Sequence, residues 1–74
     1  MQIRVKLFGV FRIDRFKEEN RDYPPGIRVR EVVDELSIPG VLLGIILING
    51  VHSNGDAILQ DGDSLSLLPL LGGG

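Results

Sequence analysis

The fold of this chain is organised around its last stretch, Ser64-Leu65-Ser66-Leu67-Leu68-Pro69-Leu70-Leu71-Gly72-Gly73-Gly74. Residues 64–68 alternate polar and apolar side chains, which predicts a β-strand with one face toward a core. Proline lacks the N–H that a continuing ladder needs, so the strand is expected to end at Pro69. The final glycines carry no Cβ and predict a thin, mobile and sterically bare tail that ends in a free carboxylate.

A terminal pair of glycines also has ordinary explanations. Glycine is roughly 7% of average composition, so such a pair arises by chance in about one chain in 200. A frayed end or a cloning remnant would look the same. The position of the tail directly after an apolar strand and a proline favours a function, because a linker usually starts from a polar segment.

Length and composition predict one small soluble domain. A chain of 74 residues buries only about 60% of its unfolded surface, so its core must be compact. The net charge of −2 weighs against nucleic-acid binding, which needs a basic surface. No apolar stretch approaches the roughly 20 residues of a membrane span, and the first residues lack the apolar block of a signal peptide. We therefore expect no membrane partner and a cytoplasmic location.

The residues offer no self-contained active site. The absence of cysteine excludes disulfides, thiolate metal sites and cysteine nucleophiles, and the single histidine excludes a histidine cluster. Asp56, Asp61 and Asp63 are typical of turns, where carboxylates accept hydrogen bonds from nearby backbone N–H groups, rather than of a metal site. No glycine-rich phosphate loop follows a strand, and no serine stands in a nucleophile motif. We expect a protein that is not itself an enzyme and that binds no metal or cofactor.

The other elements follow from periodicity. Val29, Val32, Val33 and Leu36 form one helical stripe, which Pro39-Gly40 is expected to end. The apolar run 45–48 predicts a strand that is central or covered on both faces, and residues 57–59 predict a single helical turn. The strands are expected at residues 2–7, 18–23, 45–48, 51–52 and 64–68.

Phe8 interrupts this pattern, because it falls on the polar face at the end of the first strand. It either packs under a neighbouring loop or belongs to an exposed apolar patch that binds a partner. Gly9 then permits a bend.

One helix and several strands favour an α+β fold in two layers, with the helix across one face of a mixed sheet of four to five strands. The first and last strands are suited to pair side by side in its centre. This is the β-grasp (ubiquitin-like) arrangement. We expect residues 1–68 to form the domain and residues 69–74 to form a flexible tail.

The sequence resembles the ubiquitin-like sulfur carriers, a family that includes the small subunit of molybdopterin synthase (MoaD) and the thiamine-biosynthesis carrier (ThiS). The segments that carry the resemblance run nearly end to end, and the opening Leu-Phe-Gly is closer to MoaD. They are Val5–Gly9, Pro24–Val33, Leu47–Gly50, Leu59–Leu65 and Leu68–Gly74, the last matching a Pro-Pro-Val-Ala-Gly-Gly ending with Leu70 and Leu71 in place of Pro and Val.

The resemblance implies a mechanism that uses the chain terminus. An E1-like adenylyltransferase of the MoeB or ThiF type would use ATP to adenylate the Gly74 carboxylate, and sulfur would then displace AMP to leave a thiocarboxylate. The acceptor enzyme would be a molybdopterin synthase large subunit of the MoaE type, or a thiazole synthase. The tail and partner-binding residues would be Gly73, Gly72, Leu71, Leu70, Pro69 and Phe8.

Three alternatives remain open at the level of sequence. A ThiS-like carrier would serve thiamine thiazole synthesis rather than molybdopterin synthesis. A ubiquitin-like modifier would join Gly74 to lysines of target proteins, although the tail lacks the arginines of the Arg-Leu-Arg-Gly-Gly ending of ubiquitin. A non-covalent β-grasp interaction module would carry the glycines only incidentally.

Overall fold

The computed structural model describes residues 1–70, and Leu71 to Gly74 lie outside the described part. Within that part the chain forms five strands, one α-helix and two 3-10 helices. In chain order these are β1 (Gln2–Leu7), η1 (Gly9–Arg12), β2 (Glu18–Asp22), α1 (Val29–Glu35), η2 (Gly40–Leu42), β3 (Leu43–Ile48), β4 (Val51–His52) and β5 (Ser64–Pro69).

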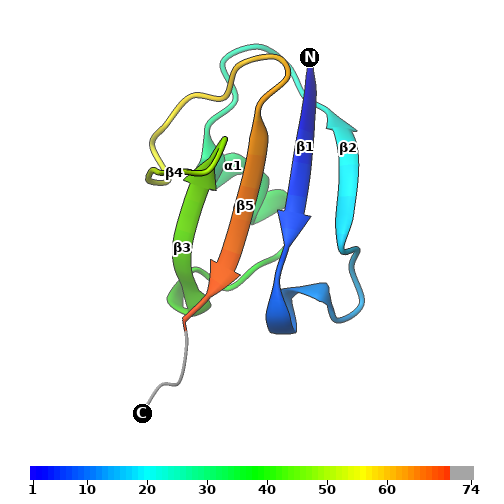
Figure 1. Cartoon of the computed structure of the whole chain (residues 1–74), viewed down its shortest axis with the longest axis vertical. Coiled ribbons are helices and arrows are strands. Elements are labelled where there is room, and N and C mark those ends of the chain that lie inside the picture. The colour runs from blue at the N-terminus through cyan, green and yellow to red at the C-terminus, as the bar shows by residue number, and fades with distance from the viewer. Residues whose placement is uncertain (71–74) are drawn as a thin grey trace.

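The strands form one mixed sheet in the order β2-β1-β5-β3-β4. The first and last strands, β1 and β5, pair in parallel, and the other neighbours are antiparallel. Figure 1 shows β5 in the middle of the sheet with α1 lying behind it. This is the predicted β-grasp fold, with the charged strand β2 at one edge as expected.

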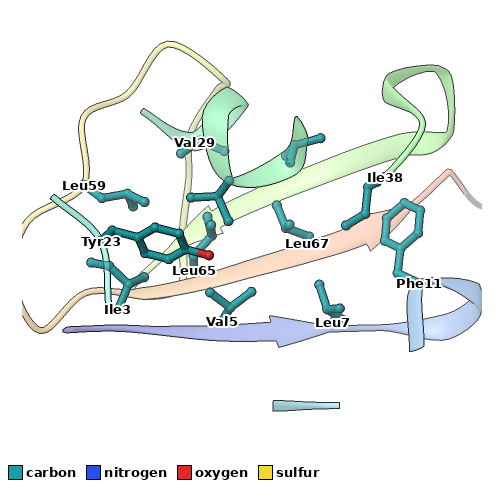
Figure 2. Packing of buried hydrophobic residues seen from close by; sticks show 12 residues of the cluster. Ile3, Val5, Leu7, Phe11, Tyr23, Val29, Ile38, Leu59, Leu65 and Leu67 are labelled. Carbon is teal, nitrogen blue, oxygen red and sulfur yellow. The ribbon is translucent and has the colours of Figure 1, made fainter. Parts of the chain in front are cut away.

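The core lies between α1 and the sheet. Ile3, Val5 and Leu7 on β1 point to the same side as Leu65 and Leu67 on β5, and all five side chains are fully buried (Figure 2). Each such side chain contributes about 1.5–3 kcal/mol when it leaves water. The helix adds Val29, Val32 and Val33, and the remaining buried members are Phe11, Tyr23, Ile38 and Leu59.

The start of α1 depends on residues outside the usual cap. The side chain of the N-cap residue Arg28 has no acceptor for the free N–H groups of the first turn. The Glu31 carboxylate instead accepts from the backbone N–H of Arg28 at 2.7 Å, and the carbonyl of Ala57 accepts from the N–H of Val29 at 3.0 Å. A local bond to Glu31 and a tertiary bond to Ala57 therefore take the place of a side-chain cap at Arg28.

The end of α1 lies a few residues before the pair that was expected to end it. The helix ends at Glu35, before Pro39-Gly40, and Ser37 takes the left-handed conformation with φ of 56°. The guanidinium of Arg15 donates to the carbonyl oxygens of Leu36 and Ser37, both at 2.9 Å. Arg15 thus supplies hydrogen-bond donors to carbonyls at the end of α1.

Two further segments differ from the prediction. No helix was predicted between the first two strands, but this segment contains the 3-10 helix η1, which buries the Phe11 ring against the core. Residues 57–59 form no helical turn. Ile58 bridges to Arg28 in antiparallel fashion, and the N–H of Leu59 donates to the carbonyl of Ile27 at 2.9 Å.

Asp61 and Asp63 accept hydrogen bonds from backbone N–H groups at a turn, as predicted, whereas the carboxylate of Asp56 forms an ion pair with Arg30. Asp63 accepts hydrogen bonds from the backbone N–H of Gln60 and the side-chain amide of Asn49, both at 2.8 Å. Asp61 accepts from the backbone N–H of Gln2 at 2.7 Å and so ties this turn to the start of β1.

Candidate functional site: the tail exit and the helix-free face

The tail leaves the body through a backbone contact between its base and the start of β3. Strand β5 reaches Pro69, one residue farther than predicted, and the N–H of Leu70 donates to the carbonyl of Leu42 at 2.7 Å. The side chain of Leu70 remains 60% exposed. The chain is therefore held through Leu70, and four residues follow it in the sequence.

A bulge in β3 accompanies this exit. Leu43 pairs with Pro69 and Ile45 pairs with Leu68, so Gly44 is an extra residue without a partner. The predicted strand began only at residue 45, and Gly44 was not singled out as a functional residue. An isolated glycine inside an apolar run is the signal that points to a bulge or a close backbone approach.

The other side of Pro69 faces η1. A Cβ added at Gly9 would lie 3.1 Å from Cγ of Pro69, so the absence of a side chain makes room for the proline ring. Gly9 also has a positive φ of 56°, which confirms the bend predicted there.

The predictions for Leu71, Gly72, Gly73 and Gly74 fall outside the described residues. Of the proposed tail, the structure places Pro69, which is half-buried in β5, and Leu70, which is exposed just beyond it.

The sheet face opposite α1 carries a second apolar surface. Residues Ile45, Leu47 and Leu68 alternate with core residues, so they point away from the helix, and each is half-buried. The prediction that the run 45–48 is interior to the sheet is confirmed, because β3 lies between β5 and β4. Among residues 1–70, no helix or second sheet covers the side chains on this face.

Phe8 lies at the tail end of this same face. Its N–H donates to the carbonyl of Leu67 at 3.3 Å, and continuing the β1–β5 register sets it beside Leu68. The ring is half-buried, and the guanidinium carbon of Arg12 lies 5.5 Å from its centroid. The open face patch, defined here as Phe8, Ile45, Leu47 and Leu68, therefore runs up to the tail exit.

A shallow groove lies at the same end of the body, between η1 and the segment that follows α1. Its volume is about 540 Å³, and it is lined in part by Val10, Ile13 and Leu42, which are 55%, 64% and 45% exposed. Leu42 is also the residue whose carbonyl binds Leu70. Apolar surface thus borders the exit on the side away from the open face patch.

Among residues 1–70, no group of three histidine, aspartate or glutamate side chains gathers closely enough to hold a metal ion. No helix in that part of the chain is long and apolar enough to cross a membrane.

The family model of the ThiS family matches residues 5–74, a span that includes both the body and the glycine ending. No curated protein sequence matches the chain. Similarity is found among solved structures.

The chain is similar to a putative molybdopterin converting factor, subunit 1, from Pyrococcus furiosus, with 27% identity, a TM-score of 0.77 and coverage of 93% of this chain and 97% of that one. It is also similar to a structure of subunits 1 and 2 of molybdopterin-converting factor from Helicobacter pylori, with 26% identity, a TM-score of 0.67 and full coverage of both chains. SAMP1 from Haloferax volcanii shares the fold, with 20% identity, a TM-score of 0.78 and full coverage.

Proposed function

Because the chain belongs to the ThiS family, we propose that it is a sulfur carrier that holds sulfur as a thiocarboxylate on Gly74. The observation that carries this proposal is the family match through the last residue, on a body whose middle strand β5 leads directly into the glycine tail.

The chemistry needs two balanced steps. A Gly74 carboxylate oxygen attacks the α-phosphorus of ATP, forming an acyl adenylate as pyrophosphate leaves. Hydrosulfide then attacks the carbonyl carbon and forms a C–S bond. The C–O bond to AMP breaks, AMP leaves with the electron pair, and the thiocarboxylate and a proton remain. Adenylation is required because a carboxylate is a poor electrophile and AMP is a good leaving group. Neither step changes an oxidation state.

The tail fits this role by its size. Four residues follow Leu70, and a chain of four spans at most about 14 Å when fully extended. Glycines at 72, 73 and 74 present no side chain to a narrow active-site channel. Five residues past Pro69 would reach about 17 Å, and the bond to Leu42 shortens this reach because it holds Leu70 to the body.

A short tail requires close docking of the body. The open face patch gives the adenylating enzyme an apolar surface that ends beside the exit, and Phe8 marks its edge. Docking raises the effective concentration of the carboxylate at the active site. Phe8, Pro69 and Leu70 are accordingly our proposed partner-binding residues within the described part.

We favour molybdopterin synthesis as the pathway. Two of the similar structures are of a putative molybdopterin converting factor subunit 1 and of a molybdopterin-converting factor, and the latter holds subunits 1 and 2 together. By this similarity the acceptor enzyme would be a large subunit of the MoaE type. A thiazole synthase is the alternative acceptor, since the matching family model is that of ThiS.

Mass spectrometry tests the carrier function. The protein is incubated with ATP, hydrosulfide and the E1-like adenylyltransferase from the same organism, and its intact mass is measured. Exchange of one oxygen for sulfur adds about 16 Da, and a variant lacking Gly74 should gain nothing while folding normally. An unchanged mass of the full-length protein would refute the proposal.

The acceptor is tested separately with the thiocarboxylated protein. Mixing it with a molybdopterin synthase large subunit and the pterin precursor should restore the ordinary carboxylate. Restoration only with a thiazole synthase would assign the carrier to thiamine synthesis. Attachment of Gly74 to lysines of other proteins would make it a modifier.

A further inference from the structure

We propose that Gly44 is a positioning residue for the terminal carboxylate, because it fixes the line along which the tail leaves the body. The inference rests on the proposed carrier function and concerns how the body aims the tail. Gly44 lies outside the tail and belongs to β3, more than twenty residues earlier in the chain.

The contact between Gly44 and the tail base is too close for any side chain. A Cβ at position 44 would lie 2.9 Å from the nitrogen and 3.0 Å from the Cα of Leu70, and 3.1 Å from the carbonyl carbon of Pro69. All three atoms belong to the backbone, so no rotation of a side chain relieves the overlap. An alanine would push the tail base away from β3.

The requirement at Gly44 is one of space and not of backbone conformation. The described glycines with positive φ are Gly9, Gly26, Gly50 and Gly62, and Gly44 is not among them. Its φ therefore lies outside the left-handed region that favours glycine. What glycine provides here is therefore the close approach of Leu70.

The bulge explains why the approach occurs at this point. Pro69 has no N–H to give to β3, and the extra residue Gly44 shifts the ladder by one position there. Pairing then resumes as the Leu70 N–H donates to the Leu42 carbonyl at 2.7 Å. On the opposite side the Pro69 ring lies against Gly9. We call this arrangement of Gly9, Leu42 and Gly44 around the tail base the exit seat.

The exit seat matters because so little chain follows it. Four residues reach at most about 14 Å when fully extended, so a shift of the tail base moves the farthest point that the carboxylate can reach by a similar amount. Displacement of a reacting group by about 1 Å can cost on the order of 10²-fold in rate. The body would dock as before, while the carboxylate would miss its attacking position.

The test compares Gly44→Ala with Gly40→Ala in the assay with ATP, hydrosulfide and the adenylyltransferase. Gly40 is a matched control, since a Cβ there meets nothing within 4 Å and its φ is not positive. We expect kcat for thiocarboxylate formation to fall by about 10- to 100-fold in Gly44→Ala, with KM for the carrier changed less than about 3-fold. Gly40→Ala should match the wild type.

If Gly44 had a purely structural role, kcat would not fall selectively in Gly44→Ala. Equal activity of the two variants, or a loss confined to KM, would overturn the positioning role while leaving the carrier function intact. A wild-type protein that gains no sulfur would instead refute the carrier function, which the same assay reveals before any variant is made.

Amide hydrogen exchange on the wild type supplies a test that does not depend on the folding of a variant. The Leu70 amide should exchange at least about 10-fold more slowly than an unstructured reference, because it is bonded to Leu42. Exchange at the unstructured rate would show that the exit seat does not hold the tail base, and would overturn the inference.

Discussion

The phenol of Tyr23 donates a 2.7 Å hydrogen bond to Oε1 of Glu35 and thereby ties the end of β2 to α1. Nε of Arg21 donates to the same phenol oxygen at 2.9 Å. Burial is the main cause that raises the pKa of Tyr23 to about 12, and the bond to Glu35 adds to it while Arg21 opposes it. The native state therefore keeps this phenol protonated.

Stability should consequently fall at high pH. In the unfolded chain Tyr23 loses its proton near pH 10, whereas the native protein retains it to about pH 12. Between these values the native state binds more protons, so the free energy of unfolding decreases as pH rises. The urea midpoint of the wild type should fall between pH 9 and pH 11. The fall should be larger than in Tyr23→Phe, which has no phenol to titrate.

The same residue offers a direct spectroscopic check. Tyr23 is the single tyrosine of the chain, and tryptophan is absent, so the near-ultraviolet absorbance of tyrosinate reports on it alone. A native-state titration midpoint near pH 10 would contradict the raised pKa.

Arg15 should be a stabilising residue, although it is charged and lies in the loop between η1 and β2. Its guanidinium donates to the carbonyls of Leu36 and Ser37, which close α1. Because hydrogen bonds from a charged donor are worth about 1.5–3 kcal/mol, Arg15→Ala should lower the free energy of unfolding by about 2 kcal/mol. Urea denaturation measures it, with Lys17→Ala as an exposed control. A loss equal to that of Lys17→Ala would contradict this role.

Replacing Arg28 should strengthen α1. Its backbone already has the extended conformation of an N-cap, with φ of −101° and ψ of 156°. The N–H of Glu31 donates to the carbonyl of Arg28 at 3.0 Å, and Arg28→Ser adds a side-chain acceptor that completes a capping box worth about 1 kcal/mol. The urea midpoint should rise for Arg28→Ser relative to Arg28→Ala, which removes the same guanidinium without adding an acceptor. No difference between the two variants would disprove the capping gain.

Phe8 should contribute to docking more than to folding. Its half-buried ring forms the tail end of the open face patch. Removing an aromatic side chain from such a position often weakens binding by about 1–2 kcal/mol, or about 10-fold in Kd. Calorimetric titration of Phe8→Ser with the adenylyltransferase or the large subunit measures the effect. Val51→Ser is the control, since Val51 is 67% exposed on β4. Equal affinities would exclude Phe8 from the interface.

The parts of the fold that follow from local pattern were predictable. Alternation in 2–7 and 64–68 identified the two strands that pair in the centre, because a half-buried strand repeats every two residues. The valine stripe identified α1 in the same way. The β-grasp arrangement followed from the order of these elements.

The errors lie where distant contacts override local pattern. Pro39-Gly40 was expected to end α1, but the helix already ends at Glu35, where Arg15 from another loop donates to the carbonyl of Leu36. Phe11 was expected in an irregular loop, but its burial against the core organises η1. Residues 57–59 are drawn into an extended bridge by Arg28 instead of forming their own helical turn.

The candidate site shows the same division. Pro69 and Phe8 could be singled out from sequence, since each interrupts a pattern at the end of a strand. The role of Gly44 could not, because a glycine in an apolar run says only that something approaches closely. Which backbone approaches is a property of the register between β3 and β5.

The central position of β5 has a consequence during synthesis. Strands β1 and β3 do not pair with each other and are joined only through β5, so any fragment that stops before Ser64 lacks the strand between them. Such a fragment cannot close its sheet, and pairing the first strand with the last is a slow, long-range event. A polypeptide released early from the ribosome would thus be left to cellular proteases, and would not compete with finished molecules for their enzymes.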